Sequence, residues 1–396
     1  MKIFFETKNF DPGKNFFEIT ELKGIGHPDT LCDSIGAKLG IEYSKFWLKE
    51  IGGELHNIPH YNLDKLLLGG GESSKKWKGG SITKPVDVII GGNVTKKVGK
   101  TELDLQNFCE KHVKKVLQKN AGQKFEYKVI TNHLSKGSSA LVKNYQDNKE
   151  ISLANDTSFG TGHYPYTKLE ETVKAVQNYL LQKKLTKKWI GTDIKIMGRR
   201  TKDENFITVA LATIDEHISD DEDYLDKMHG IRRELMQKFD INSLNLNMAD
   251  KPHLGKQEDN YYLTVSGTSA ENADPGQIGR GNRTNGLISP FRYQTLEATA
   301  GKNLTRHVGG FYNIWAQQIS KKLHEKLGLN SQVVIVSELG RPITECMVSV
   351  VTSQKITDPK KVEDLAKEVM DNHEKNVYNI LENKIEYYPF NYLKNV

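Results

Sequence analysis

Four short segments of the chain gather residue types that bind phosphate groups and divalent metal ions. The first is Gly-Ile-Gly-His-Pro-Asp at residues 24–29, where Pro28 suits the first position of a helix. His27 and Asp29 then lie at the positive end of that helix, which attracts phosphate, and a carboxylate there can hold a metal ion against the phosphate. An ordinary capped helix, with Asp29 and Asp33 in solvent, explains these residues equally well when they are taken alone.

The second segment, residues 154–162, is a loop of small polar residues and glycines that follows a possible strand at 150–153. Loops at strand ends commonly carry function. Asp156 in this loop can accept a hydrogen bond from a ligand amine or hydroxyl. It can also close an Asx turn, which is the commoner role of an aspartate in such a loop.

The third segment, residues 192–200, alternates in the manner of a strand. The alternation puts Asp193, Lys195 and Met197 on one face. Lys195 can therefore offer a positive charge to a phosphate, and a surface ion pair between Asp193 and Lys195 is the alternative.

The fourth segment, residues 267–283 with its continuation at 297–307, mixes many glycines with arginines and lysines. Backbone N–H groups and guanidinium groups presented together are suited to a polyphosphate. Asp274 and Glu297 lie within this basic stretch, as a metal-assisted phosphate site requires. A loop that contacts an RNA backbone is the rival interpretation, but such a surface would normally interleave aromatic residues and omit the carboxylates.

Together the four segments resemble the archaeal-type branch of the methionine adenosyltransferases, also called S-adenosylmethionine synthetases. The motifs that carry the resemblance run in the family's order from His27 to His307: Gly-Ile-Gly-His-Pro-Asp, Asn-Asp-Thr-Ser-Phe-Gly, Asp-Ile-Lys-Ile-Met-Gly, and Gly-Thr-Ser-Ala-Glu-Asn through Gly-Arg-Gly-Asn-Arg to Ala-Gly-Lys-Asn. The resemblance implies that methionine sulfur attacks C5′ of ATP and that the released tripolyphosphate is hydrolysed to pyrophosphate and phosphate. The alternatives are a non-catalytic regulatory subunit that binds nucleotide or S-adenosylmethionine, and a different ATP-dependent transferase or phosphatase on the same fold.

The resemblance also implies roles for individual residues. The residues implied in catalysis are His27, Lys195, Arg280 and Lys302. Those implied in binding ATP and its polyphosphate are His27, Lys195, Asp274, Arg280, Arg283, Lys302 and Arg306. Those implied in binding methionine are Glu72, Asp156 and Asp274. The metal ligand that it implies is Asp29.

The cofactor that the resemblance implies is Mg²⁺, expected at two ions per site, and K⁺ stays open as a further cation. The second magnesium ligand is not fixed, because Val308 stands nearest to the place of the family's second aspartate. Glu297 and Asp33 are the candidates for it. Leu304 stands where the family pattern has proline, and Arg306 is expected to take over a lysine contact.

The elements that must position these residues follow from local patterns. Strands are predicted by β-branched content at residues 86–90, 127–131, 206–215, 261–266, 332–337 and 345–352. Helices are predicted at residues 167–185, 304–327 and 358–383, the first opened by a capping box of Thr167 and Glu170. Because strands outnumber helices and follow one another as antiparallel neighbours do, the pattern favours an α+β fold over a Rossmann sheet.

The family resemblance sharpens this to three similar α+β domains about a pseudo-threefold axis. We expect an N-terminal region at 1–150, a middle region at 151–265 and a C-terminal region at 266–396, with structural domains interleaved in sequence. It further implies ATP and L-methionine as substrates, and a homodimer or dimer of dimers with sites at the subunit interface.

Composition limits the remaining possibilities. The chain has 396 residues, 27% of them charged, and a net charge of only +6. Because it shows no long apolar run and no signal peptide, we expect a cytoplasmic protein without a membrane partner. The modest charge gives no ground for a nucleic-acid partner. Cys32, Cys109 and Cys346 are too widely spaced for a zinc site or a disulfide framework.

Overall fold

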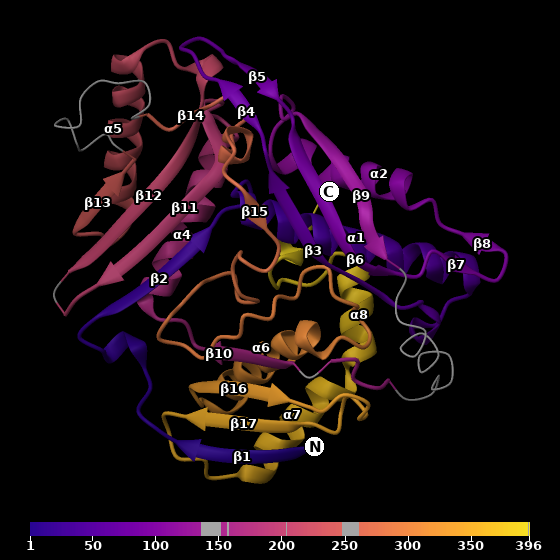
Figure 1. Cartoon of the computed structure of the whole chain (residues 1–396). Coiled ribbons are helices and arrows are strands. Elements are labelled where there is room, and N and C mark those ends of the chain that lie inside the picture. Colours follow the sequence, from indigo (N-terminus) through magenta and orange to yellow (C-terminus); the bar gives the residue numbers. More distant parts are fainter. Residues whose placement is uncertain (136–151, 157, 203, 248–260, 395) are drawn as a thin grey trace.

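The fold is built from three separate β-sheets, each with helices on one face (Figure 1). The computed structural model describes residues 1–135, 152–156, 158–202, 204–247, 261–394 and 396. Figure 1 shows the sheets around the centre of the molecule, as the predicted pseudo-threefold arrangement of α+β units requires. The predicted fold class is confirmed.

The first sheet, called the β3 sheet, has the order β15-β3-β6-β9 and packs against helices α1 and α2. Its strands are β15 (Gly276–Gln277), β3 (Tyr61–Gly69), β6 (Val86–Val94) and β9 (Tyr127–Ser135). The two helices are α1 (Pro28–Ile51) and α2 (Leu105–Asn120). Leu31, Ile35 and Leu39 form the buried stripe of α1, as the sequence pattern predicts, and pack in the core under this sheet.

The second sheet, called the β11 sheet, has the order β13-β12-β11-β2, with β14 beside β12. Its strands are β13 (Ser243–Leu246), β12 (Asn205–Ile214), β11 (Ile190–Arg200), β2 (Glu18–Lys23) and β14 (Leu263–Thr264). Its helices are α4 (Lys168–Lys184) and α5 (Asp221–Lys238). The predicted capping box of Thr167 and Glu170 is confirmed at the start of α4, where each residue's side chain accepts from the other's backbone N–H.

The third sheet, called the β16 sheet, has the order β1-β17-β16-β10. Its strands are β1 (Lys2–Thr7), β17 (Met347–Thr352), β16 (Ser331–Val336) and β10 (Phe159–Tyr164). Its helices are α6 (Val308–Leu327) and α7 (Pro359–Asp371), and α8 (His373–Leu381) follows. Gly160 and Gly162 let β10 lie directly on α6, since a Cβ atom at either position would lie within 2.4 Å of the α6 backbone.

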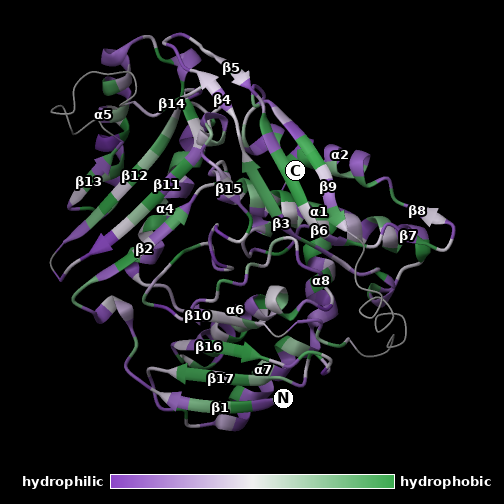
Figure 2. Cartoon of the chain, viewed as in Figure 1, coloured by the Kyte–Doolittle hydropathy of each residue, from purple (hydrophilic) through white to green (hydrophobic). Residues whose placement is uncertain are grey.

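Shorter elements complete the described chain. Two small hairpins are β4 (Glu72–Ser74) with β5 (Ser81–Lys84) and β7 (Lys97–Val98) with β8 (Thr101–Glu102). Short 3-10 helices are η1 (Pro12–Lys14), η2 (Leu55–Asn57), η3 (Asp215–His217), η6 (Ser269–Asn272) and η7 (Phe390–Leu393). Figure 2 shows hydrophobic residues along the strands of all three sheets. Each sheet shares one buried apolar cluster with its helices.

Three predicted elements differ from the structure. The helix predicted from residue 304 begins at Val308, because Asn303 Oδ1 accepts from the N–H groups of Thr305 and Arg306 and holds a turn there. The strand predicted at 261–266 shortens to Leu263–Thr264. The N–H groups of residues 265 and 266 donate instead to the carboxylate of Glu271, at 2.6 and 2.7 Å.

The helix predicted at 358–383 is divided into α7 and α8. Asn372 causes the break, because its side-chain amide donates to the Glu368 carbonyl at 2.7 Å and closes α7. Two further predictions lie partly outside the described residues: 150 and 151 of the possible strand at 150–153, and 157 of the loop after it. None of the helices in the described part of the chain is both long and apolar enough to cross a membrane.

Candidate active site

The start of α1 is fixed by a turn that lies against β11. The Gly24 N–H donates to the Ile194 carbonyl at 2.6 Å, and the Gly26 N–H to the Thr192 carbonyl at 3.0 Å. Gly26 is required at this close approach, since a Cβ atom there would come within 2.6 Å of the Thr192 carbonyl carbon. His27 then caps the helix, with its Nδ1 accepting from the Asp29 N–H at 3.2 Å. The turn therefore places His27 and Asp29 at the positive end of α1.

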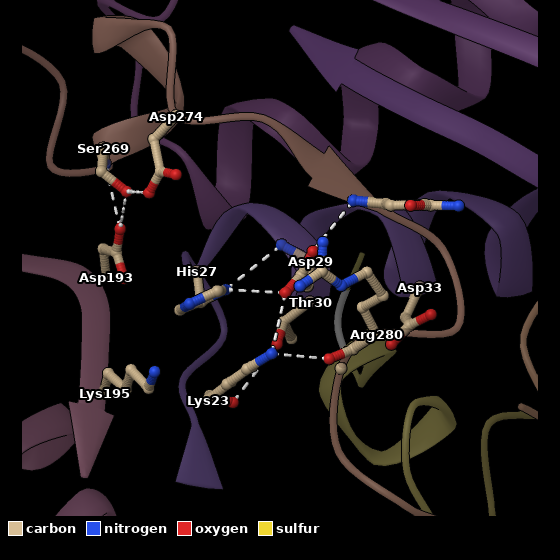
Figure 3. Close-up of polar contacts among 12 residues, drawn as sticks. Lys23, His27, Asp29, Thr30, Asp33, Asp193, Lys195, Ser269, Asp274 and Arg280 are labelled. Atoms are coloured by element: carbon tan, nitrogen blue, oxygen red, sulfur yellow. Dashed lines mark hydrogen bonds and ion pairs between the residues drawn. The ribbon is translucent and has the colours of Figure 1, made fainter. Parts of the chain in front are cut away.

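Asp29 lies among cations and backbone donors (Figure 3). Its Oδ2 pairs with the Lys23 ammonium at 2.8 Å, and its Oδ1 accepts from the Gln277 N–H at 2.9 Å. Burial opposes its ionisation, but the hydrogen bonds from Lys23 and Gln277 outweigh burial and lower the pKa of Asp29. Asp29 is therefore an anion able to hold a cation.

His27 stays neutral at physiological pH. Burial is the largest influence and lowers the pKa of His27 from 6.5 to about 4, the neighbouring Asp29 opposing the shift. The positive charges of Lys23, Lys195 and Arg280 lower it further. Figure 3 shows these three residues around His27. The predicted residues His27, Asp29, Lys195 and Arg280 thus come together in one group, which we call the helix-start group.

A pH-dependent loss of stability should follow from this shift. Because the pKa of His27 is lower in the folded chain, the unfolded chain binds more protons between pH 6.5 and 4, so stability falls as the pH falls through that window. His27→Asn keeps an acceptor for the Asp29 N–H. Between pH 7 and pH 5 we expect its free energy of unfolding to fall by about 2 kcal/mol less than that of the parent. Urea unfolding at both pH values measures the difference, and equal losses would contradict it.

The glycine-arginine loop that carries Arg280 begins at β15 and is braced from within. The Arg283 guanidinium donates to the carbonyl oxygens of Gly279 and Gly281 at 2.7 and 2.8 Å, and to that of Thr295 at 3.0 Å. The Lys23 ammonium donates to the Arg280 carbonyl at 2.7 Å. Arg280 itself is exposed. The family resemblance implies that Arg283 binds the polyphosphate, but here its guanidinium donates to carbonyl oxygens of the loop. Arg280 is therefore the arginine of this loop that is available to a ligand.

Asp33, a candidate for the second magnesium ligand, is enclosed behind this loop. Its side chain has no exposed surface, its Oδ1 accepts from the Gly279 N–H at 2.7 Å, and its Oδ2 accepts from the Tyr388 hydroxyl. Burial raises the pKa of Asp33 to about 6. Because Asp33 is wholly enclosed, with no surface open to a ligand, the structure argues against Asp33 as a metal ligand.

Asp193 and Asp274 meet through Ser269, apart from His27 in Figure 3. Asp193 Oδ2 accepts from the Ser269 hydroxyl at 2.7 Å and from the Tyr262 hydroxyl at 2.8 Å. Asp274 Oδ2 lies 2.9 Å from the same serine hydroxyl. Burial raises the pKa of Asp193 to about 6.

The alternative of an ion pair between Asp193 and Lys195 is wrong. Lys195 instead pairs with Glu21 Oε2 on the neighbouring strand β2, at 3.3 Å. Its charge lies on the face of the sheet turned away from the helices, as the alternation predicts, since the opposite face at Gly198 packs on Leu169 and Val173 of α4. Lys195 therefore lies on the open face of β11, with Glu21 as its ion-pair partner.

A second group surrounds Lys302 and includes residues that sequence reasoning missed. The Lys302 ammonium lies 3.2 Å from Glu297 Oε2 and 3.6 Å from Asp64 Oδ2, and it is buried. Burial opposes ionisation of Asp64, but the charge of Lys302 together with the hydrogen bond and charge of Lys65 outweighs burial and lowers the pKa of Asp64. The sequence gives no clear sign of Asp64, because it lies between Asn62 and Lys65 in the more polar first half of β3.

The same group holds Asp156 and Arg306. Asp156 Oδ2 lies 3.1 Å from Nε2 of His307, and the N–H of Asn155 donates to the Arg306 carbonyl at 3.3 Å. Arg306 is buried beside them. The segment 302–307 thus carries Lys302, Arg306 and His307, the partner of Asp156, and we call these residues with Asp64 and Glu297 the Lys302 group.

The two groups lie at different levels of α1. Gly36 packs against Gly301, next to Lys302, whereas Asp29 is seven residues earlier on the helix, about 10 Å along its axis. Glu72 is exposed on β4, whose neighbouring residue Ser73 donates to Glu271 at 3.1 Å. Glu72 thus lies on a strand that packs against η6, the short helix that begins at Ser269. It does not belong to the Lys302 group.

The donors at the helix start fit a magnesium ion that is shared with a ligand. Among the described residues, no three or more His, Cys, Asp and Glu side chains converge as a complete metal site. Magnesium commonly needs only one or two carboxylates, with water and substrate phosphate completing its shell. Asp29 already accepts an ammonium at 2.8 Å, so the position suits a cation. Glu297 pairs with Lys302 instead, in the other group.

Comparison with known proteins gives an independent test. Residues 3–387 match the family model described as S-adenosylmethionine synthetase. The chain is 38% identical over 360 residues to the S-adenosylmethionine synthase of Sulfolobus acidocaldarius, with 86% of each chain covered. It is 37% identical over 366 residues to that of Saccharolobus solfataricus, covering 87% of this chain and 89% of the relative.

The fold comparison agrees. A solved structure described as an unusual S-adenosylmethionine synthetase from Campylobacter jejuni superposes with a TM-score of 0.58 at 15% identity. The match covers 90% of this chain and 86% of that one. At this identity the likeness concerns the fold alone.

Proposed function

This chain belongs to the S-adenosylmethionine synthetase family and is a methionine adenosyltransferase, and on that premise we propose how its own residues perform the transfer. The reaction joins methionine sulfur to C5′ of ATP and expels the whole triphosphate chain. A thioether is a modest nucleophile, so the rate must come from alignment and from stabilising the charge on the departing group. The proposal includes hydrolysis of the tripolyphosphate to pyrophosphate and phosphate at the same site.

The observation that carries the assignment of roles is the convergence of Lys23, Lys195 and Arg280 on a neutral histidine at a helix start. Two unit charges about 4 Å apart interact by roughly 4 kcal/mol at an effective dielectric constant near 20. Several cations around one triphosphate can therefore stabilise the leaving group strongly. Lys195 and Arg280 take this role, and neutral His27 donates a hydrogen bond to the ribose oxygen or its phosphate as the C5′–O bond breaks.

The metal belongs beside Asp29. The family uses metal ions, and we infer that Asp29 holds Mg²⁺ here after Lys23 gives up its contact. The ion would neutralise phosphate charge when bound, and we expect two ions per site. Glu297 remains a candidate for the second ion, and K⁺ a candidate monovalent cation.

Methionine and adenosine need acceptors for their amine and hydroxyl groups. Asp274, joined to Asp193 through Ser269, lies next to the helix-start group and serves either substrate. Asp156 and Glu72 are proposed for the methionine amine. Lys302 and Arg306 supply further positive charge to the polyphosphate, with Asp64 and Glu297 holding the Lys302 ammonium in place. We expect this chemistry in the cytoplasm.

A homodimer, or a dimer of dimers, would bring the two groups to one site. The sheet faces turned away from the helices carry apolar side chains that are 37–46% exposed: Phe4, Leu67, Phe159, Met197 and Met347. Lys195 lies on the same open face as Met197. A partner that covers these faces would bury apolar surface and bring its own Lys302 group near the helix-start group.

This assembly predicts complementation between mutant chains. His27→Ala and Lys302→Ala should each be nearly inactive alone, because each removes one half of every site. Mixing the two chains under conditions of subunit exchange should restore activity, since a mixed dimer holds one site with both residues intact. Gel filtration with activity measured on dilution is the control. A fully active monomer near 44.8 kDa would contradict the dimer.

The overall assignment is tested by products. Purified protein with ATP, methionine and Mg²⁺ should yield S-adenosylmethionine by mass, together with pyrophosphate and phosphate. S-adenosylmethionine formed together with intact tripolyphosphate would support the transferase activity and contradict the proposed hydrolysis step. ADP or AMP without a sulfonium product would indicate a different ATP-dependent enzyme, and ligand binding without turnover would indicate a regulatory subunit.

A further inference from the structure

The C-terminal segment of the chain reaches back to the glycine-arginine loop. The Tyr388 N–H donates to the Thr284 carbonyl at 3.0 Å, and its hydroxyl donates to Asp33 on α1. Both Tyr388 and Asp33 are buried, so this contact is closed to solvent. The family match described above ends at residue 387, one residue before this tyrosine. A segment distant in sequence therefore passes directly behind the proposed active site.

The contact holds the loop on both sides of Arg280. Asp33 Oδ1 accepts from the Gly279 N–H at 2.7 Å. At Gly281 the backbone passes so closely that a Cβ atom would lie 2.0 Å from both Asp33 Oδ2 and the Tyr388 hydroxyl. The residues immediately before and after Arg280 are thus fixed against the same carboxylate and hydroxyl pair.

The opposite side of the loop is also held, which leaves Arg280 little freedom of backbone position. The Lys23 ammonium donates to the Arg280 carbonyl at 2.7 Å, and the Asn282 side chain exchanges two hydrogen bonds of 2.8 Å with the Lys23 backbone. The exposed Arg280 side chain projects from a backbone clamped between Lys23 and the Asp33–Tyr388 pair.

We propose that Tyr388 and Asp33 are positioning residues for the transferase, which set the place of Arg280 against the leaving triphosphate. Neither side chain reaches a substrate, because both are enclosed beneath the loop. Their effect passes through the backbone at Gly279 and Gly281. A displacement of the guanidinium by about 1 Å is enough to lower turnover by roughly a hundredfold. The inference rests on the methionine adenosyltransferase activity proposed above.

The first test removes only the tyrosine hydroxyl. We expect Tyr388→Phe to lower kcat/KM for ATP by about tenfold or more while the KM for methionine changes by less than about twofold, because Arg280 contacts polyphosphate. Tyr312→Phe is the matched control. It also loses a buried hydroxyl, one that donates to the Ile343 carbonyl at 2.6 Å, but it lies on α6 under a different sheet. Tyr312→Phe should leave both constants close to those of the parent.

The second test asks whether the effect passes through Arg280. In an Arg280→Ala background, Tyr388→Phe should lower kcat/KM by less than about twofold further, since the group being positioned is gone. Independent, multiplying effects would overturn the proposal, as would equal losses toward ATP and methionine or an unchanged Tyr388→Phe enzyme. If the parent makes no S-adenosylmethionine, the proposed function fails instead.

A third pair of variants covers the case in which Tyr388→Phe does not fold. Asp33→Asn keeps an acceptor for the Gly279 N–H and a polar group toward Tyr388, whereas Asp33→Ala keeps neither. We expect Asp33→Asn to retain at least about tenfold more of the kcat/KM for ATP than Asp33→Ala when both are folded by circular dichroism. Equal activities of the two folded variants would overturn the role given to Asp33.

Discussion

Replacing Lys195 by methionine is expected to lower turnover by at least about a hundredfold, the scale seen when one donor that stabilises developing charge is removed. Lys195 lies on the open face of β11, held by a single ion pair to Glu21 at 3.3 Å, and its charge acts on His27. Methionine preserves most of the side-chain length without the charge. Steady-state turnover and apparent ATP affinity are the measurements.

Lys124→Met is the matched control for this experiment. Lys124 also forms an ion pair with a glutamate, 2.7 Å from Glu216, and is similarly exposed, but it lies outside both groups of site residues. Exposed ion pairs contribute little stability, so this variant should keep parental turnover. A change of less than about threefold for Lys195→Met would place Lys195 among such surface lysines and exclude it from the transition state.

Asp29→Asn should strongly lower magnesium-dependent turnover while leaving a folded protein. The amide keeps an acceptor for the Gln277 N–H, and Lys23 keeps its bond to the Arg280 carbonyl, so the helix start retains its contacts. It loses the negative charge that a divalent ion needs. We expect at least about a hundredfold lower turnover, with a higher magnesium concentration for half activity.

The control for Asp29 is Asp104→Asn at the start of α2. Asp104 also accepts a backbone N–H at a helix start, from Asn107 at 3.2 Å, so the substitution repeats the change of charge at a helix end without a metal site. Thermal unfolding of both variants separates stability from catalysis. If Asp29→Asn unfolded at ordinary temperature but kept parental activity per folded molecule, Asp29 would have only the capping role.

Local sequence patterns predicted helices and strands correctly where contacts between residues close in sequence determine the structure. The capping box at Thr167 and the apolar stripe of α1 lie within single helices, and both are confirmed. The start of α6 and the strand near residue 263 were misplaced because side chains of Asn303 and Glu271 take up backbone N–H groups. Competition of this kind depends on where a side chain points, which residue spacing does not reveal.

The candidate site was predictable as a set of residues and only partly as an arrangement. His27 and Asp29 belong to one motif at the start of a single helix, so the sequence alone predicted that they lie close together. Lys23 and Asp64 were missed because each lies within an ordinary strand and gains its role only from residues far along the chain. Asp33 was open to two interpretations until Tyr388, from the opposite end of the chain, proved to cover it.

The pairing of the first strand with one of the last has a consequence for how the protein is made. β1 runs parallel to β17 from the pair Lys2–Met347 to the pair Thr7–Thr352. A ribosome adding about 5–20 residues per second leaves β1 without its neighbour for roughly 20 to 70 seconds. During that time the strand and its phenylalanines, Phe4 and Phe5, form an unpaired edge. Nascent chains that stall before Met347 should therefore be those most dependent on chaperones.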